Sequence, residues 1–289
     1  MKVLKMNRHL QNFMDSFNSG KDFLYFFLAD LVTFSLIFVI FSWFTAYLQQ
    51  KSFEVMQGKS MEELQQILAS SNPEQVLPFL NSLRSFLIWA VAGIIILAVL
   101  SFLLYSLSRA VIWYHVGNKK VTKKTYWRWN LLNLSLIIPL SFFLLIFFVV
   151  KILASTIVSM IFTLFPVFFA IHSKFAENFR LAFNGAVSFY LVLSFLVIIF
   201  MIYNRFSHNY KVWESLGSGF GVYKKNWKKL SVMVLFAAVV ALAVSLAGIV
   251  VKGSVYSPTI LMFFNLALGS AFLAWLRLYV LKAVSHGHN

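Results

Sequence analysis

The sequence predicts an all-α fold: a polytopic transmembrane helical bundle of six or seven membrane-embedded helices with short interfacial amphipathic helices. Of the 289 residues, 60% are hydrophobic and only 12% are charged, whereas soluble domains average roughly 45–50% and 25%. The apolar residues also gather in stretches of about 20, the length that a helix needs to cross the hydrocarbon. Backbone groups in lipid must pair within the segment, so these stretches are expected to be helices. We expect one integral membrane domain over 1–289.

Seven apolar stretches are candidate spans. They are 23–48, 85–114, 131–150, 152–171, 185–204, 230–251 and 258–283.

The charged residues between these stretches predict the topology. The chain carries a net charge of +16, from 25 Lys and Arg against 9 Asp and Glu. Segments 115–130 and 205–229 are strongly basic, whereas 49–83 holds two lysines and four glutamates. The positive-inside rule makes 115–130 and 205–229 basic cytoplasmic loops and 49–83 an extracytoplasmic helical loop. The amphipathic segment 1–22 is then also cytoplasmic, in a multi-pass protein of the cell membrane.

This topology contains a conflict of parity. Three apolar stretches separate the two basic loops, and an odd number of crossings would put the loops on opposite sides. Either one loop violates the rule, or one stretch does not cross. Pro166 and the Ser/Thr content of 152–171 indicate a re-entrant or tilted half-span there, although ordinary membrane helices also tolerate these residues. Lys151 is expected to mark a tight outer turn and to snorkel to the headgroups.

A four-lysine motif occurs once in each basic loop, as KKVTKK at 119–124 and KKNWKK at 224–229. Basic and aromatic residues together are also typical of nucleic-acid surfaces, but here each copy precedes a hydrophobic span. We therefore expect no nucleic acid, and interpret these side chains as topology anchors for anionic lipid headgroups. The predicted anchors are Lys119, Lys120, Lys123, Lys124, Trp127, Arg128, Trp129, Lys224, Lys225, Trp227, Lys228 and Lys229.

Short amphipathic segments precede several spans. Apolar residues recur at helical spacing in 10–17, 173–185 and 208–229. Either these segments are interfacial helices in the headgroup region, or they are cytoplasmic extensions of the spans. In 49–83, the capping patterns SMEE at 60–63 and SNPE at 71–74 predict two short helices. These would form a lid on the bundle or a hairpin resting on the membrane surface.

Two stretches resemble a group of prokaryotic six-helix membrane proteins that includes the membrane domain beside some glycerophosphodiester phosphodiesterases. They are AENFRLAFNGAVSFYLVLSF at 176–195 and WESLGSGFGVYKKNWKKLSVMVLF at 213–236. Each has an acidic start, small residues in the middle and a following span; the first lacks the basic-aromatic end. The matching residues are Glu177, Ala182 and Gly185 in the first copy, and Glu214, Gly217, Gly221, Trp227 and Lys228 in the second. The resemblance implies an architecture, a membrane module whose partner does the chemistry, and no activity of its own.

Asp30 is the one acidic residue inside an apolar stretch, and intramembrane ionisable residues are costly and often functional. Arg109 lies on the same half of the bilayer, so the two form a candidate intramembrane polar pair. This pair either fixes the first span against the second or serves a proton or ion step.

The remaining chemistry is sparse. The chain has no cysteine, and its six histidines lack ligand spacing backed by an acid. HExxH, Gly-x-Ser-x-Gly and GxxxxGK[ST] motifs are absent, and GSGFG at 217–221 follows no predicted strand. We therefore expect no enzyme, no catalytic residue, no metal and no cofactor.

Two functions stay open on the sequence. The first is a non-enzymatic module that binds anionic lipid, or a protein partner, through a basic aromatic cytoplasmic face. The second is a small transporter or channel subunit with Asp30 in its pathway, for which Pro166 would mark a broken helix. A homo-oligomer or a subunit of a larger complex is compatible with both. A polar cavity lined by Asp30 would favour transport, and a sealed apolar core would favour the first function.

Overall fold

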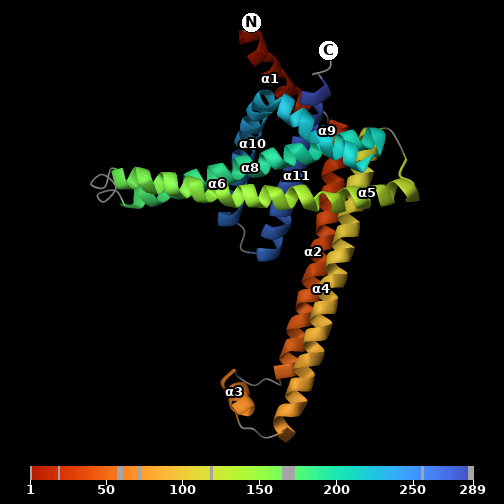
Figure 1. Ribbon diagram of the computed structural model, residues 1–289, viewed down its shortest axis with the longest axis vertical. Helices are drawn as coiled ribbons and strands as arrows, with labels where there is room; N and C mark the ends of the chain where they lie inside the picture. The colour runs from red at the N-terminus through yellow and green to blue at the C-terminus, as the bar shows by residue number, and fades with distance from the viewer. Residues whose placement is uncertain are drawn as a thin grey trace. The chain divides into compact units, whose positions relative to one another are not determined.

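The computed structural model describes residues 2–18, 20–56, 61–69, 73–117, 120–164, 173–254 and 257–285. Across these ranges the chain is helical, without a strand (Figure 1). The helices are α1 (Lys2–Phe17), α2 (Gly20–Met56), α3 (Met61–Ala69), α4 (Pro73–Val116), α5 (Lys123–Ser135), α6 (Ile137–Leu164), α8 (Ser173–Asn209), α9 (Val212–Lys225), α10 (Trp227–Ser254) and α11 (Pro258–Ser285).

Within the described residues, six helical regions are long and apolar enough to cross a membrane. They are Gly20–Met56, Val76–Val116, Lys123–Leu164, Glu177–Asn209, Leu230–Gly248 and Pro258–Ala283. The most apolar part of the second region has 0% of its residues buried by protein, as expected where lipid is the solvent. The chain is a multi-pass integral membrane protein, and the predicted all-α class is confirmed.

The chain packs as two compact units, where hydropathy alone predicted one domain. The first unit combines Met1–Leu31 with Arg109–Asn289, and the second is Val32–Ser108. Among the described residues, every buried apolar side chain belongs to the first unit.

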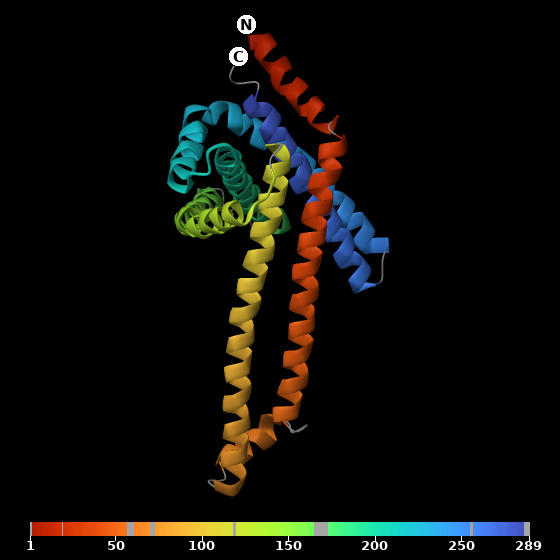
Figure 2. The same cartoon turned by 90° about the vertical axis from the view of Figure 1, so that its right-hand side faces the viewer.

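The second unit consists of α3 and long portions of α2 and α4, which run side by side in opposite directions (Figures 1 and 2). Helix α2 has 37 residues and α4 has 44, or about 56 and 66 Å at 1.5 Å per residue. Because the hydrocarbon is about 30 Å thick, both helices continue beyond it.

The loop predicted at 49–83 is mostly helical and includes the end of α2 and the start of α4. The first short helix is present as α3 (Met61–Ala69), but the second is not separate. The segment that begins at Pro73 is the start of α4 and continues without interruption into the span. The predicted loop is therefore largely an extension of two spans.

In the first unit, α6 packs on α8, α10 packs on α11, and α8 contacts α10. In Figure 1 the α6–α8 pair runs across the α10–α11 pair. Helix α1 lies against α11, where Phe13 contacts Trp275 and Tyr279, and the Trp275 indole N–H donates to Ser16 Oγ at 2.8 Å. The amphipathic helix predicted around 10–17 is thus seated on the last span.

One continuous helix bears on the parity conflict. Helix α6 runs from Ile137 to Leu164 and passes through Lys151, so the outer turn predicted at that lysine is wrong. All of 131–150 and the first part of 152–171 therefore belong to one candidate membrane-crossing region, Lys123–Leu164. Residues 165–171, with the predicted irregularity at Pro166, lie outside the described residues. Within the described residues, two candidate crossing regions rather than three lie between the lysine motifs. If each of them crosses once, the chain returns to the same side.

The interruption in this region lies earlier than expected, at Leu136. Helix α5 ends at Ser135 and α6 begins at Ile137, although the Leu136 N–H still donates to the Leu132 carbonyl at 2.9 Å. Pro139 explains the break, since its ring clashes with the carbonyl four residues earlier, that of Ser135, and it has no N–H to donate.

The amphipathic segments 173–185 and 208–229 differ in whether they are continuous with a span. Segment 173–185 is the beginning of α8 and continues into the span, so it is an extension. Segment 208–229 contains a separate helix, α9, between α8 and α10. The reversal from α8 to α9 occurs at Tyr210, whose φ of 56° lies in the left-handed region.

Candidate functional site

The first lysine motif surrounds the start of α5. Thr122 is the N-cap: its Oγ1 accepts from the Thr125 N–H at 3.4 Å, and Thr125 Oγ1 accepts from the Thr122 N–H at 2.9 Å. Lys123 and Lys124 occupy the first turn, where the positive end of the helix dipole disfavours cations. These lysines therefore do not stabilise the helix that they begin, and their charge is available to another group.

The second motif surrounds the junction of α9 and α10. Lys224 and Lys225 lie in the last turn of α9, where the dipole favours cations, and Lys228 lies in the first turn of α10. Asn226 closes α9 by donating its N–H to the Val222 carbonyl at 3.1 Å. Both copies thus place lysines around the beginning of a helix that leads into an apolar region.

Most predicted anchors are exposed, and we call these residues the basic surface. It comprises Lys120, Lys123, Lys124, Trp127, Arg128, Lys224, Lys225, Trp227 and Lys228. Trp127 and Trp227 are 58% and 56% exposed. Lys119 lies outside the described residues, and of Lys229 the structure describes only its place in α10.

Trp129 is a correction to the prediction. It is 0% exposed and cannot act as a headgroup anchor. Its ring packs edge-on against Phe206 at 4.9 Å between centroids and lies 5.5 Å from Tyr203. On the helix α5, Trp127 and Trp129 are two residues apart and point to different faces, so one contacts solvent or lipid while the other enters the core.

Aromatic contacts hold the ends of several helices together beneath the basic surface. Tyr114, near the end of α4, stacks on Tyr210 at 5.8 Å, and Trp129 of α5 contacts α8 through Phe206. Tyr203 donates its hydroxyl to Asn133 Oδ1 at 2.7 Å. Helix α5, which begins in the first lysine motif, is consequently attached to a buried aromatic cluster.

Helix α9 is amphipathic and carries exposed aromatic side chains. Val212 and Leu216 are buried, whereas Trp213 is 68% and Phe220 40% exposed. Glu214, in the first turn, forms an ion pair with Lys211 at 2.9 Å, and this lysine lowers the pKa of the Glu214 carboxyl.

An apolar groove of about 430 Å³ lies beside α9, with a wall of α5, α6 and α8 residues. It is lined by Ser135, Ile138, Pro139, Phe142, Phe143, Ile146, Phe195, Ile198, Trp213, Leu216 and Phe220. Its volume is within the range of small-molecule sites.

The structure brings Asp30 and Arg109 together and adds a third residue, Arg277. Arg109 donates Nη2 to Asp30 Oδ1, and Arg277 donates Nη2 to Asp30 Oδ2 at 3.0 Å. Asp30 and Arg277 are 0% exposed and Arg109 2%. These three residues, the buried ion triad, join α2, α4 and α11 within the first unit.

Two aromatic rings complete the environment of the triad. The Arg277 guanidinium lies 5.3 Å from the centroid of Phe26 and 5.2 Å from that of Phe200. Such rings attract a cation through their quadrupole, most strongly when both are desolvated. Phe200 belongs to α8, so the triad also positions a fourth helix.

Arg277 was not among the residues predicted from the sequence, although a signal for it was present. Arg277 lies inside the apolar stretch 258–283, where a charge requires a partner. Asp30 is the one acid within an apolar stretch. Pairing each intramembrane base with this acid would have indicated the contact between the first and last spans.

No protein-family model, no curated protein and no solved structure matches this chain. The resemblance to six-helix membrane proteins therefore stays a prediction. Within the described residues, no group of three or more His, Cys, Asp or Glu side chains could hold a metal ion.

Proposed function

We propose that this protein is a non-enzymatic membrane module of the cell membrane whose basic surface binds anionic lipid headgroups. The observation that carries the proposal is the clustering of exposed lysines around two helix starts, that of α5 and the junction of α9 with α10. In α5, Lys123 and Lys124 lie where the dipole disfavours them. A phosphate group at this position would receive favourable interactions both from the lysines and from the helix N-terminus.

The even number of regions between the motifs supports a common leaflet for both copies. Exposed Trp127 and Trp227 suit the headgroup level, where amphipathic rings are enriched. Trp213 and Phe220 on α9 add apolar contact beside the charge, as in interfacial helices that combine both forces.

The state of Asp30 argues against the transport alternative. Its carboxylate is fully buried and both oxygens accept from guanidiniums. A carboxylate in a permeation pathway needs access to water or to the passing ion. The triad instead suits a role in fixing helices, the structural interpretation of the Asp30–Arg109 pair.

The test compares lipid affinity of the detergent-solubilised full chain for dioleoylphosphatidylglycerol and dioleoylphosphatidylcholine by microscale thermophoresis. The variant replaces Lys120, Lys123 and Lys124 by Gln. A matched control replaces three exposed basic residues elsewhere, Arg84, Lys151 and Lys252, by Gln.

We expect the wild type to prefer the anionic lipid. In the variant, its affinity for this lipid at low salt should fall on the order of 100-fold, because each near-surface lysine contributes about 1 kcal/mol. High salt should weaken wild-type binding. Equal affinity for both lipids, or an equal loss in the control, would contradict the proposal.

A further inference from the structure

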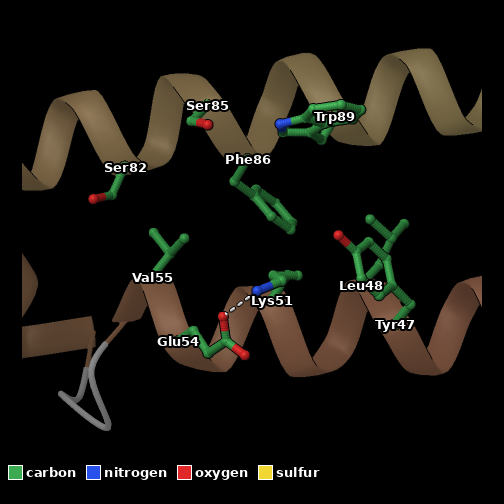
Figure 3. A pocket seen from close by; sticks show the side chains of 9 residues that line it. All are labelled: Tyr47, Leu48, Lys51, Glu54, Val55, Ser82, Ser85, Phe86 and Trp89. Atoms are coloured by element: carbon green, nitrogen blue, oxygen red, sulfur yellow. Dashed lines mark hydrogen bonds and ion pairs between the residues drawn. The ribbon is translucent and has the colours of Figure 1, made fainter.

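A second surface of the protein combines charge with apolar groups, in the α2–α4 portion of the second unit. Two cavities of about 540 and 230 Å³ adjoin there and share Tyr47 and Trp89. The larger one has a mixed lining, in which Lys51 and Glu54 from α2 and Ser82 and Ser85 from α4 stand among apolar side chains (Figure 3). The smaller one is lined almost entirely by apolar side chains.

The lining follows one face of each helix. Along α2 it passes through Glu54, Lys51, Tyr47, Phe44 and Ile40, at steps of three and four residues, the spacing of a single helical face. Along α4 it follows the same kind of spacing. From Glu54 to Ile40 the rise is about 21 Å. The two cavities therefore form one groove, polar at one end and apolar at the other.

The polar end carries one charge of each sign. Lys51 Nζ lies 2.5 Å from Glu54 Oε2, and the two side chains remain 43% and 48% exposed. Glu54 Oε1 also accepts from Gln50 at 3.3 Å. Because the two charges of the lining cancel, this end does not favour a headgroup with a net negative charge.

At the apolar end, Gly93 of α4 lets the Phe44 ring of α2 pack directly on the helix backbone. A Cβ atom on Gly93 would lie 2.2 Å from Phe44 Cε2, so the ring occupies the space above the bare backbone. Trp89 and Trp43 are 67% and 69% exposed, and Trp43 stacks on Tyr47 at 6.1 Å. Such rings at the junction of polar and apolar surface are typical of the membrane interface.

We infer that this groove holds one phospholipid with a zwitterionic, primary-ammonium headgroup, as in phosphatidylethanolamine. Lys51 and the hydroxyls of Ser82 and Ser85 complement its phosphate, and Glu54 with the face of Trp89 complements its ammonium. An acyl chain follows the apolar end past Phe44. The groove shares no residue with the basic surface and takes a different headgroup.

The experiment titrates the full chain in detergent with dioleoylphosphatidylethanolamine or dioleoylphosphatidylglycerol and counts bound lipid by native mass spectrometry. Glu54→Gln should reduce ethanolamine-lipid binding by at least about tenfold, because a charge-assisted hydrogen bond is lost. The matched control is Glu62→Gln, an exposed acid of the same unit outside the groove.

A second pair of variants tests the apolar end independently. Ile96 lines the groove and Ile95 does not, although they are 59% and 58% exposed. Ile96→Trp should reduce binding of the ethanolamine lipid, whereas Ile95→Trp should leave it unchanged. Size-exclusion elution at the wild-type volume establishes that each variant is folded.

Equal binding of both lipids, or equal effects of the two variants in a pair, would overturn the inference. Complete competition by soluble glycerophosphoethanolamine would also overturn it, because it would identify a headgroup site that does not hold an acyl chain. Because the anionic-lipid proposal concerns the other lipid and Lys120, Lys123 and Lys124, either proposal can fail alone.

Discussion

Replacing Asp30 by asparagine keeps the size of the side chain but removes the one negative charge of the buried ion triad. Arg109 and Arg277, with side chains 3% and 0% exposed, would then lie together in the core without their shared carboxylate. Breaking a buried ion pair from one side costs about 3–5 kcal/mol. Against a total stability of roughly 5–15 kcal/mol, we expect a large loss of folded protein.

The appropriate assay is reversible unfolding of the purified full chain in mixed detergent–SDS micelles, followed by tryptophan fluorescence. Asp22→Asn is the matched control, since Asp22 lies on the same helix but forms an exposed pair with His115 at 3.0 Å. Exposed pairs contribute about 0–1 kcal/mol, so the control should unfold close to the wild type.

A further variant separates charge from packing. Replacing Asp30 by Leu together with Arg109 and Arg277 by Met removes all three charges with similar volume, and should recover most of the stability lost in Asp30→Asn. If Asp30→Asn unfolds with the control, or if the triple variant is no better than the single one, the interpretation of the triad as an electrostatic clamp is refuted.

Two more predictions concern packing and topology. Gly219→Ala should lower the free energy of unfolding by about 1–3 kcal/mol, because the new Cβ would lie 2.4 Å from Ile202 Cγ1 and 3.1 Å from the Ile202 Cα of α8. Gly217→Ala is the control, since its Cβ would meet nothing within 4 Å. In the same unfolding assay it should raise the free energy of unfolding by up to about 1 kcal/mol, because alanine is the better helix former. The chain has no cysteine, so single cysteines can report topology. Cysteines at 124 and 225 should react with an impermeant maleimide from one side of the membrane, and a cysteine at 62 should react from the other side. Labelling of 124 and 225 from opposite sides would contradict the two-crossing path between them.

The sequence alone was sufficient for the properties that depend on transfer of side chains from water to lipid. Apolar length and scarcity of charge predicted the helices, and the positions of lysines predicted which connections are basic. The same reasoning detected that three apolar stretches between the lysine motifs were incompatible with a common side. Asp30 and Arg109 were also selected correctly as potential neighbours, because an intramembrane charge requires compensation.

Other properties depended on which faces of the helices meet. Lys151 was expected to end a helix, but lysine is a good helix former and its long side chain keeps the charge at the surface, so α6 continues through it. Trp129 has the same local composition as Trp127, and only the position of α8 shows that it is buried. Arg277 joins Asp30 across 247 positions. Hydropathy measures how far each segment prefers lipid to water, whereas such contacts depend on the three-dimensional packing of one segment against another.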